Sequence, residues 1–385
     1  MSESVQTIVN CRAISPGFDL ARARVRIEGK HIAAIAEGEV LPAEGEIVDA
    51  GGRWLVPGFI DIHTHGANGF DTCDGSGKRV SGMAEAKLRE GITTFLPTTL
   101  TLAAERLEEV MRGVAEYQAD PTHAKAPLVH IEGPFINPKC AGAQNPAFVR
   151  NPDVAEIERL NAIAPVGIVS LAVEQPGGVE FVAAMRERGI TCSLAHTAAT
   201  HADFAAAKAA GLKHLTHFCN QMTALHHREI GIVGAGLMDD EILIEMICDK
   251  IHLCPDMLKL VWKLKPVDQL MIITDSMSAS WLPDGSYDLG GLKVIVKERQ
   301  ARLENGALAG STALYFEEFR NILDITGLPP SVVIQATSWN QASSLGLEGV
   351  GKIESGFLAD LALLEPVTSK PETVWVEGER KFGTG

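Results

Sequence analysis

Short apolar runs alternate with amphipathic stretches through the middle of the chain. Eight of these runs have the length and the β-branched content of buried strands. They cover residues 59–66, 93–98, 128–135, 167–174, 191–197, 214–220, 243–252 and 269–276. Helix-like segments separate them, among them residues 78–90, 102–117, 153–162, 178–188 and 201–210. Eight βα units predict a (β/α)8 barrel of the TIM type, whose active site lies at the C-terminal ends of the strands.

The two ends of the chain have a different pattern. The segments RARVRIEG, HIAAIAEG, ADLALLEP and ETVWVEGE are short and are separated by Gly, Pro or charged residues, as strands of a β-domain are. Neither end has enough strands to bury a sheet alone. We therefore expect one small β-sandwich domain from residues 1–55 plus 353–385, and a barrel domain from residues 56–352. The segment SWLPDGSYDLGGL, residues 280–292, is rich in turn formers and predicts a hairpin or a lid.

Composition and charge exclude several classes of protein. Hydrophobic residues make up 46% of the chain, which favours a large core over disorder. The 34 basic and 49 acidic residues give a net charge of −15, so the chain has no global attraction for nucleic acid or an anionic membrane. The 7 cysteines include no CxxC pair, as is usual in a reducing compartment. Without a secretory signal or a membrane-length apolar run, a cytoplasmic protein is expected.

Histidine and carboxylate residues cluster where the predicted strands end. Six of the eight strands end in one or both. These residues are His63 and His65 in IDIHTHG, Glu132 in HIEGPF, His196 in LAHT, His217 in THFCN, Asp249 and His252 in DKIH, and Asp275 in ITDS. Chance placement would scatter the 12 histidines over surface and helices. Because a barrel gathers its strand ends, the pattern predicts one shared site.

Three of these residues form a set of metal ligands. Glu132, His196 and His217 come from three strands, and imidazole and carboxylate are the usual ligands of zinc and its neighbours. Three protein ligands with an open position are typical of a catalytic site. A divalent ion there lowers the pKa of a bound water and polarises a carbonyl. Asp275 is then placed to take the proton of that water and to protonate a leaving amine.

Each candidate also has a structural interpretation. A single buried histidine is more often satisfied by a hydrogen bond than by a metal, and an aspartate at a strand end is often the N-cap of the next helix. His130 lies one pleat before Glu132 and could support it from behind. Arg228 and His252 are either a solvated arginine and a core histidine or an anion site, because the forked guanidinium suits phosphate.

The motifs resemble those of one enzyme family. PGFIDIHTHG, HIEGPFINP, AHTAAT, THFCNQM, HHREIG, ITDS and LAGST occur in an order and at a spacing that resemble the N-acetylglucosamine-6-phosphate deacetylase family of the amidohydrolase superfamily. The resemblance runs over nearly the whole chain. It implies a metal-dependent hydrolase barrel, usually a zinc-containing homodimer. Such an enzyme hydrolyses the acetamide of N-acetylglucosamine 6-phosphate to glucosamine 6-phosphate and acetate.

The resemblance also implies residue roles. Glu132, His196 and His217 match the family's metal ligands, and Asp275 matches its catalytic base and acid. Arg228 and His252 match residues that hold the sugar phosphate, and the arginine of the family reaches across a dimer interface. The other matching positions in the substrate pocket are Ala143, Gln144, Asn220, Gln221, Asp249, Leu308, Ala309 and Gly310.

The sequence departs from the family pattern at several positions. Gln144 stands where the family has a histidine that helps to polarise the acetyl carbonyl; glutamine can donate a hydrogen bond but cannot be cationic. Gln221 replaces an alanine, and Lys250 in DKIH adds a positive charge for an anion. His63 and His65 are both present, although some members of the family lack the pair. They are candidate ligands of a second ion.

Other functions remain open at this point. The same chemistry could act on N-acetylgalactosamine 6-phosphate, an unphosphorylated N-acetyl sugar or another N-acyl amine, as Gln144 and Gln221 suggest. Hydrolysis of cyclic amides or dipeptides would commonly need a carbamylated lysine at the end of the fourth strand, where SLAVEQP has none. A non-catalytic sugar-phosphate sensor would need no proton shuttle, so Asp275 argues against it.

Overall fold

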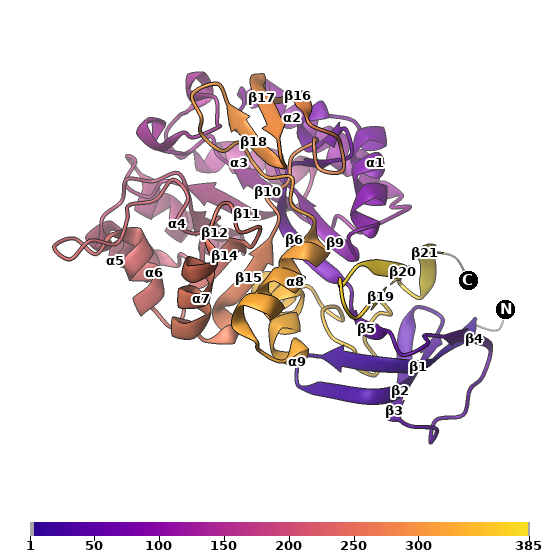
Figure 1. The fold of residues 1–385 in the computed structure, drawn as a ribbon. Coiled ribbons are helices and arrows are strands. Elements are labelled where there is room, and N and C mark those ends of the chain that lie inside the picture. The colour runs from indigo at the N-terminus through magenta and orange to yellow at the C-terminus, as the bar shows by residue number, and fades with distance from the viewer. Residues whose placement is uncertain (1–3, 384–385) are drawn as a thin grey trace.

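The eight predicted strands close into a parallel barrel in the computed structural model, which describes residues 4–383 (Figure 1). They are β6 (Phe59–Thr64), β9 (Ile92–Pro97), β10 (Val129–Glu132), β11 (Val166–Leu171), β12 (Thr191–Leu194), β13 (His214–Leu215), β14 (Leu243–Ile247) and β15 (Leu270–Ile273). Strands β10 to β15 pair in chain order, and β6 pairs with β9. Parallel bridges from Thr98 to His130 and from Thr64 to Ser276 complete the ring. Burial on both faces explains why these strands are continuous apolar runs.

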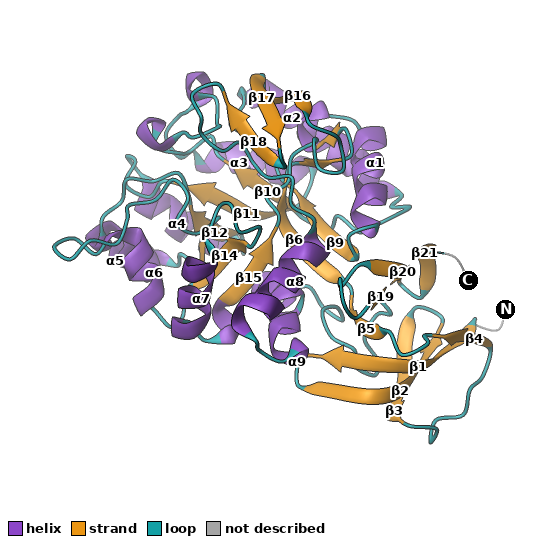
Figure 2. Ribbon diagram, in the orientation of Figure 1, coloured by secondary structure: helices purple, strands orange, loops and turns teal. Residues whose placement is uncertain are grey.

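Helices surround the barrel and cover its outer face (Figure 2). They are α1 (Gly77–Leu88), α2 (Ala104–Ala119), α3 (Val154–Ile163), α4 (Gly178–Glu187), α5 (His201–Ala210), α6 (Gly231–Met238), α7 (Pro255–Leu264), α8 (Tyr315–Thr326), α9 (Pro330–Val333) and α10 (Trp339–Leu345). The five helical segments predicted from the sequence correspond to α1 to α5. Within residues 4–383, no helix has the length and apolarity needed to cross a bilayer.

Strands from both ends of the chain share one sheet. From the N-terminal part come β1 (Val5–Ser15), β2 (Phe18–Glu28), β3 (His31–Glu37), β4 (Glu46–Asp49) and β5 (Trp54–Pro57), and from the C-terminal part β19 (Leu361–Leu364), β20 (Pro371–Val376) and β21 (Glu379–Phe382). The link is β5, which pairs with β1 on one side and with β19 on the other. Side chains from both ends, such as Ile8 and Trp375, fill a separate core.

The predicted fold class, a (β/α)8 barrel with a small domain from both termini, is therefore confirmed. The residue boundaries of the two domains stay a prediction, and residues 1–3 and 384–385 lie outside the described residues.

A three-stranded antiparallel sheet follows the last barrel strand. Its strands are β16 (Gly285–Leu289), β17 (Leu292–Lys297) and β18 (Gln300–Leu303). The tight turn between β16 and β17 uses Gly290 and Gly291, both with positive φ. The hairpin predicted at residues 280–292 is thus present, but the sequence interpretation missed its third strand. We call β16–β18 the flap, because it lies over the end of the barrel at which β10 and β6 finish (Figure 1).

The barrel strands end earlier than the sequence predicts. The prediction took the seventh strand to residue 252, whereas β14 ends at Ile247. The cause is the carboxylate of Asp249, which accepts hydrogen bonds from the backbone N–H groups of Ile251 and His252 at 2.8 and 2.9 Å. This local turn replaces the ladder of hydrogen bonds between strands.

Candidate active site

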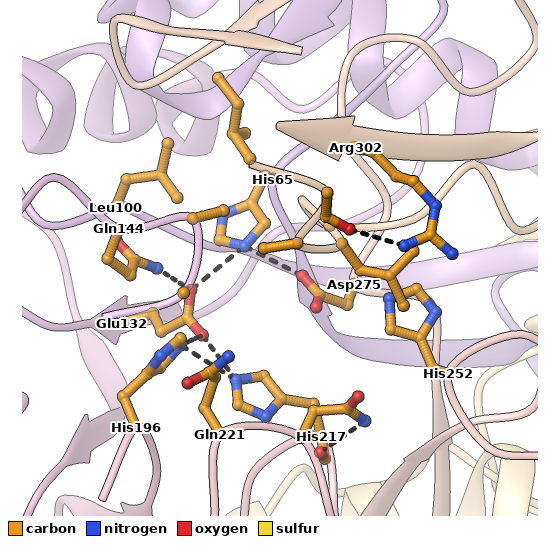
Figure 3. Close-up of a pocket in the computed structure, with 18 residues that line it drawn as sticks. His65, Leu100, Glu132, Gln144, His196, His217, Gln221, His252, Asp275 and Arg302 are labelled. Atoms are coloured by element: carbon orange, nitrogen blue, oxygen red, sulfur yellow. Dashed lines mark hydrogen bonds and ion pairs between the residues drawn. The ribbon is translucent and has the colours of Figure 1, made fainter. Parts of the chain in front are cut away.

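Two groups of histidine and carboxylate side chains meet at the C-terminal ends of the barrel strands, and Figure 3 labels all of their residues except His63. The first is Glu132, His196 and His217, as predicted. The second is His63, His65 and Asp275. In each group the possible ligand atoms all lie within 4.8 Å of one another, and all six residues are buried.

Unusual backbone conformations place three of these side chains. His196, His217 and Asp275 have φ values of 45°, 31° and 49°, which non-glycine residues rarely adopt. Such conformations cost on the order of 1–3 kcal/mol each and concentrate at functional sites. Asp275 is held there by two backbone hydrogen bonds of 2.8 Å, one to the carbonyl of His63 and one from the N–H of Ser311. The side chain of Asp275 points at His63 and His65, with Oδ1 3.4 and 3.1 Å from their Nε2 atoms, so it does not cap a helix.

Glu132 is the centre of the site. Its Oε1 lies 3.1 Å from Nε2 of His217, 3.2 Å from Nε2 of His196 and 3.6 Å from Nε2 of His63. Its Oε2 lies 3.2 Å from Nε2 of His65. Both carboxylate oxygens therefore face imidazole nitrogens, and the two groups share this residue.

The charged groups of the site shift one another's pKa values. Burial would raise the pKa of Glu132, but the charge of His63 and hydrogen bonds with His196 and His217 hold that pKa well below its usual range. Burial would likewise raise the pKa of Asp275, and His63 and His65 lower it. For His65 burial acts in the opposite direction, but Asp275 and Glu132 raise its pKa to about 9. The carboxylates are thus kept ionised in a buried place.

The donor set fits a divalent transition-metal ion. Nε2 of His196 and Nε2 of His217 lie 3.2 Å apart, and both lie within 3.2 Å of Oε1 of Glu132. In the described residues, neither ring nitrogen of the buried His63 has a hydrogen-bond partner. Buried polar atoms without partners are rare, and imidazole with carboxylate is the ligand chemistry of zinc and its neighbours.

Contacts behind the histidines fix their orientation. Nδ1 of His196 lies 2.9 Å from the carbonyl oxygen of Cys140, so Nε2 is left to face the site. Glu245, in the middle of β14, lies with one oxygen 2.9 Å from Nδ1 of His214 and the other 3.7 Å from Nδ1 of His63. The sequence interpretation missed Glu245, because an acid inside an apolar strand carries no motif.

His130 does not touch Glu132. Its ring nitrogens lie 2.9 Å from the carbonyl oxygen of Ile62 and 2.7 Å from Oγ of Ser170. Burial and the charge of His63 lower its pKa to about 3. His130 is a neutral core histidine that ties three strands together.

A cavity of about 330 Å³ opens from the metal-ligand groups toward the flap. Such a volume suits a small molecule. The predicted site residues that line it are His65, Glu132, Ala143, Gln144, His196, His217, Asn220, Gln221, His252, Asp275, Leu308 and Gly310. Lining residues that the sequence interpretation missed include Leu100, Leu289 and Arg302, of which the last two belong to the flap.

Besides His63, which is fully buried, four predicted residues do not line this cavity. Asp249 lies behind His252 and contacts its Nδ1 at 2.8 Å. Ala309 is fully buried. Arg228 is exposed, and its guanidinium contacts the neighbouring His227 at 2.7 Å. Lys250 lines a separate cavity, so the expectation that it adds charge to this site is wrong.

Gln144 has a different contact from the one its position suggests. Its Nε2 donates to Oε2 of Glu132 at 2.6 Å, and its Oε1 accepts from the backbone N–H of Thr101 at 2.7 Å. The side chain is only 4% exposed. Gln144 therefore orients Glu132, and one hydrogen of its amide is left to face the cavity.

The comparisons with known proteins agree with this geometry. The Amidohydrolase family model matches residues 54–383. The N-acetylglucosamine-6-phosphate deacetylase of Lysinibacillus sphaericus is 35% identical over 342 residues, which cover 88% of each chain. The N-acetylgalactosamine-6-phosphate deacetylase of Escherichia coli O157:H7 is 32% identical over 356 residues, 91% of this chain and 94% of that protein. An alanine mutant of N-acetyl-D-glucosamine-6-phosphate deacetylase from Mycobacterium smegmatis, solved with N-acetyl-D-glucosamine-6-phosphate, superposes with a TM-score of 0.92 at 28% identity, covering 99% and 100% of the chains.

The barrel, the site and the match over residues 54–383 define the class: the chain belongs to the amidohydrolase family. It is an enzyme that hydrolyses its substrate. Within the superfamily it belongs to the N-acetylglucosamine-6-phosphate deacetylase family, as the motifs predicted.

Proposed function

We propose that this protein hydrolyses the acetamide of N-acetylglucosamine 6-phosphate, releasing acetate and glucosamine 6-phosphate. The observation that carries the proposal is the placement of Asp275 beside a buried metal-ligand set at one end of a sugar-sized cavity. The relatives and the solved complex act on, or bind, substrates of this class.

Glu132, His196 and His217 would hold one divalent ion, and His63, His65 and Asp275 are candidates for a second. We propose zinc, because two imidazoles and a carboxylate are a common catalytic zinc set. When bound, such an ion polarises the acetyl carbonyl and lowers the pKa of water. His196 and His217 keep their Nε2 atoms toward it.

Asp275 moves the proton in this reaction. Its ionised carboxylate accepts a proton from the water that attacks the acetamide carbon. The same group then donates the proton to the amine nitrogen as the carbon–nitrogen bond breaks. His65, whose Nε2 lies 3.1 Å from Oδ1 of Asp275, holds the carboxylate in position.

The protein is proposed to work as a homodimer in the cytoplasm, with Arg228 supplied to the partner's cavity. The support is the match of Arg228 to a family arginine that reaches across a dimer interface, together with its exposure, which leaves it outside the cavity of its own subunit.

Subunit mixing tests this role of Arg228. The variants Arg228→Ala and Asp275→Asn are each expected to have little activity on the phosphorylated sugar. After unfolding and refolding together, mixed dimers should regain activity, since one of their two sites has an intact Asp275 and the partner's Arg228. The readout is acetate release at low substrate concentration. Absence of any gain over the separately refolded variants would show that Arg228 does not act across an interface.

A second candidate substrate is N-acetylgalactosamine 6-phosphate. The relative from Escherichia coli O157:H7 is named for that substrate and matches 91% of this chain. Gln221, which lines the cavity, is the departure from the family pattern that supports this candidate. No relative named above supports another N-acyl amine as the substrate. A non-catalytic sugar-phosphate sensor would have no use for a proton-transfer group such as Asp275.

The deciding experiment measures acetate release by zinc-loaded protein. Four substrates are compared: the two epimeric 6-phosphates and the two unphosphorylated sugars. We expect kcat/KM to be highest for N-acetylglucosamine 6-phosphate and at least about 100-fold lower without the phosphate, since charged hydrogen bonds contribute about 1.5–3 kcal/mol each. A preference for N-acetylgalactosamine 6-phosphate would show that the galactose epimer is the substrate. If neither phosphorylated sugar were hydrolysed, the proposal would be overturned.

A further inference from the structure

Arg302 is a cation at the rim of the catalytic cavity, and it lies on the flap. It belongs to β18 and pairs across an antiparallel bridge with Leu308, which also lines the cavity. In Figure 3, Arg302 and His252 lie on one side of Asp275, whereas Glu132 and Gln144 lie on the other. The cavity therefore has a cationic end and a metal-ligand end.

The side chain of Arg302 hydrogen-bonds only to neutral acceptors. Its Nε and Nη2 donate to Oε1 of Gln300 at 3.1 and 2.8 Å, and its Nη1 donates to the carbonyl of Gly306 at 2.7 Å. Both acceptors are neutral. Among residues 4–383, no carboxylate oxygen lies within 4.0 Å of this guanidinium. Two of its five N–H hydrogens are left free to bind an anion.

Of the three other cations of the flap region, Lys293 and Arg299 are paired with carboxylates, whereas Lys297 forms no ion pair among residues 4–383 and does not line the cavity. Lys293 lies 3.4 Å from a carboxylate oxygen of Glu304, and Arg299 lies 2.5 Å from one of Glu317. The contrast matters because the chain carries a net charge of −15, so an unpaired arginine beside a cavity stands out.

We propose that Arg302 is a further ligand of the substrate phosphate, beside His252, whose position matches a phosphate-binding residue of the family. Both come from the same subunit that supplies Asp275. This inference rests on the proposed function. In a 2-acetamido-hexose 6-phosphate, the acetamide and the phosphate leave the sugar ring at opposite ends. When the acetamide lies against Glu132 and Asp275, the phosphate must point away from them, which is where Arg302 and His252 lie.

The geometry of each group suits this role. The guanidinium offers a planar fork to the phosphate oxygens. His252 is fixed through its Nδ1 by the carboxylate of Asp249, so its Nε2 can face a ligand.

The test compares Arg302→Gln with the wild type on phosphorylated and unphosphorylated N-acetylglucosamine. We expect KM for the 6-phosphate to rise by about 10- to 100-fold, the usual effect of removing a charged hydrogen bond, with kcat within about threefold. For the unphosphorylated sugar, kcat/KM should not change. Lys293→Gln is the matched control, because it removes one positive charge from the same sheet outside the cavity, and it should leave both substrates unaffected.

Equal losses on both substrates would overturn the role of Arg302, since they would indicate a general disturbance of the flap. An unchanged KM would overturn it as well. Calorimetric binding of glucosamine 6-phosphate separates this inference from the proposed function. If the wild type releases no acetate but binds this ligand, and Arg302→Gln weakens that binding about tenfold or more, the phosphate site stands and the reaction is different. If the wild type neither releases acetate nor binds this ligand, both proposals fail.

Discussion

Replacing Asp275 with asparagine is expected to lower kcat for acetate release by about 10²–10⁴-fold, the range typical of a general acid or base. Asparagine has nearly the shape of aspartate and can still contact Nε2 of His65, but it cannot accept a proton from water. KM should change little, because the sugar and phosphate contacts lie elsewhere in the cavity. The ion held by Glu132, His196 and His217 should stay bound. Steady-state kinetics and metal analysis of the same sample provide the measurements.

Asp240→Asn is the control for this variant, since Asp240 is exposed and lies shortly before the start of β14, at the end of that strand opposite to the site. It should have wild-type kcat and wild-type metal content. Full activity of Asp275→Asn would exclude the proton-transfer role. A fall in metal content that parallels the fall in kcat would show instead that Asp275 acts chiefly as a ligand.

The barrel could be predicted because its physics is local. Strands buried on both faces are continuous apolar runs, and the helices between them have their own periodicity, so β6 and α1 are visible without any tertiary information. Where the strands end was harder to predict. The side chain of Asp249 captures two backbone N–H groups, and a carboxylate that turns the chain looks in sequence like a carboxylate at a strand end.

The grouping of these histidines and carboxylates could also be predicted, because histidine and acid at the ends of several strands are improbable unless the barrel brings them together. Residues that act from other elements could not. Glu245 lies inside an apolar strand, and Arg302 follows the barrel on the flap, where only pairing of β18 with β17 brings it to the cavity. Gln144 was recognised as a departure, but its hydrogen bonds to Glu132 and Thr101 depend on how the loop after β10 folds back.

Replacing Glu132 with glutamine is expected to remove the ion and to lower kcat/KM by about 10³-fold or more, since several kcal/mol of charge stabilisation depend on a bound ion. Glu132 contacts histidines of both ligand groups within 3.6 Å, so neutralising it removes the one negative charge that the two groups share. Metal analysis after dialysis should find less than the wild-type content. Added zinc should raise the Tm of metal-stripped wild type, because a ligand that binds only the folded state stabilises it, and should leave the Tm of Glu132→Gln nearly unchanged.

Glu318→Gln is the matched control, because it makes the same substitution at another buried carboxyl. Glu318 is 1% exposed, and burial together with the charge of Asp249 holds its pKa well above the usual range, so the folded protein contains it in the neutral form. Glutamine reproduces that neutral form and can still accept the hydrogen bond from the N–H of Cys248. The control should therefore keep its metal and its response to zinc. If Glu132→Gln kept both as well, Glu132 would not be a ligand, and the ion would have to be held by His63, His65 and Asp275 instead.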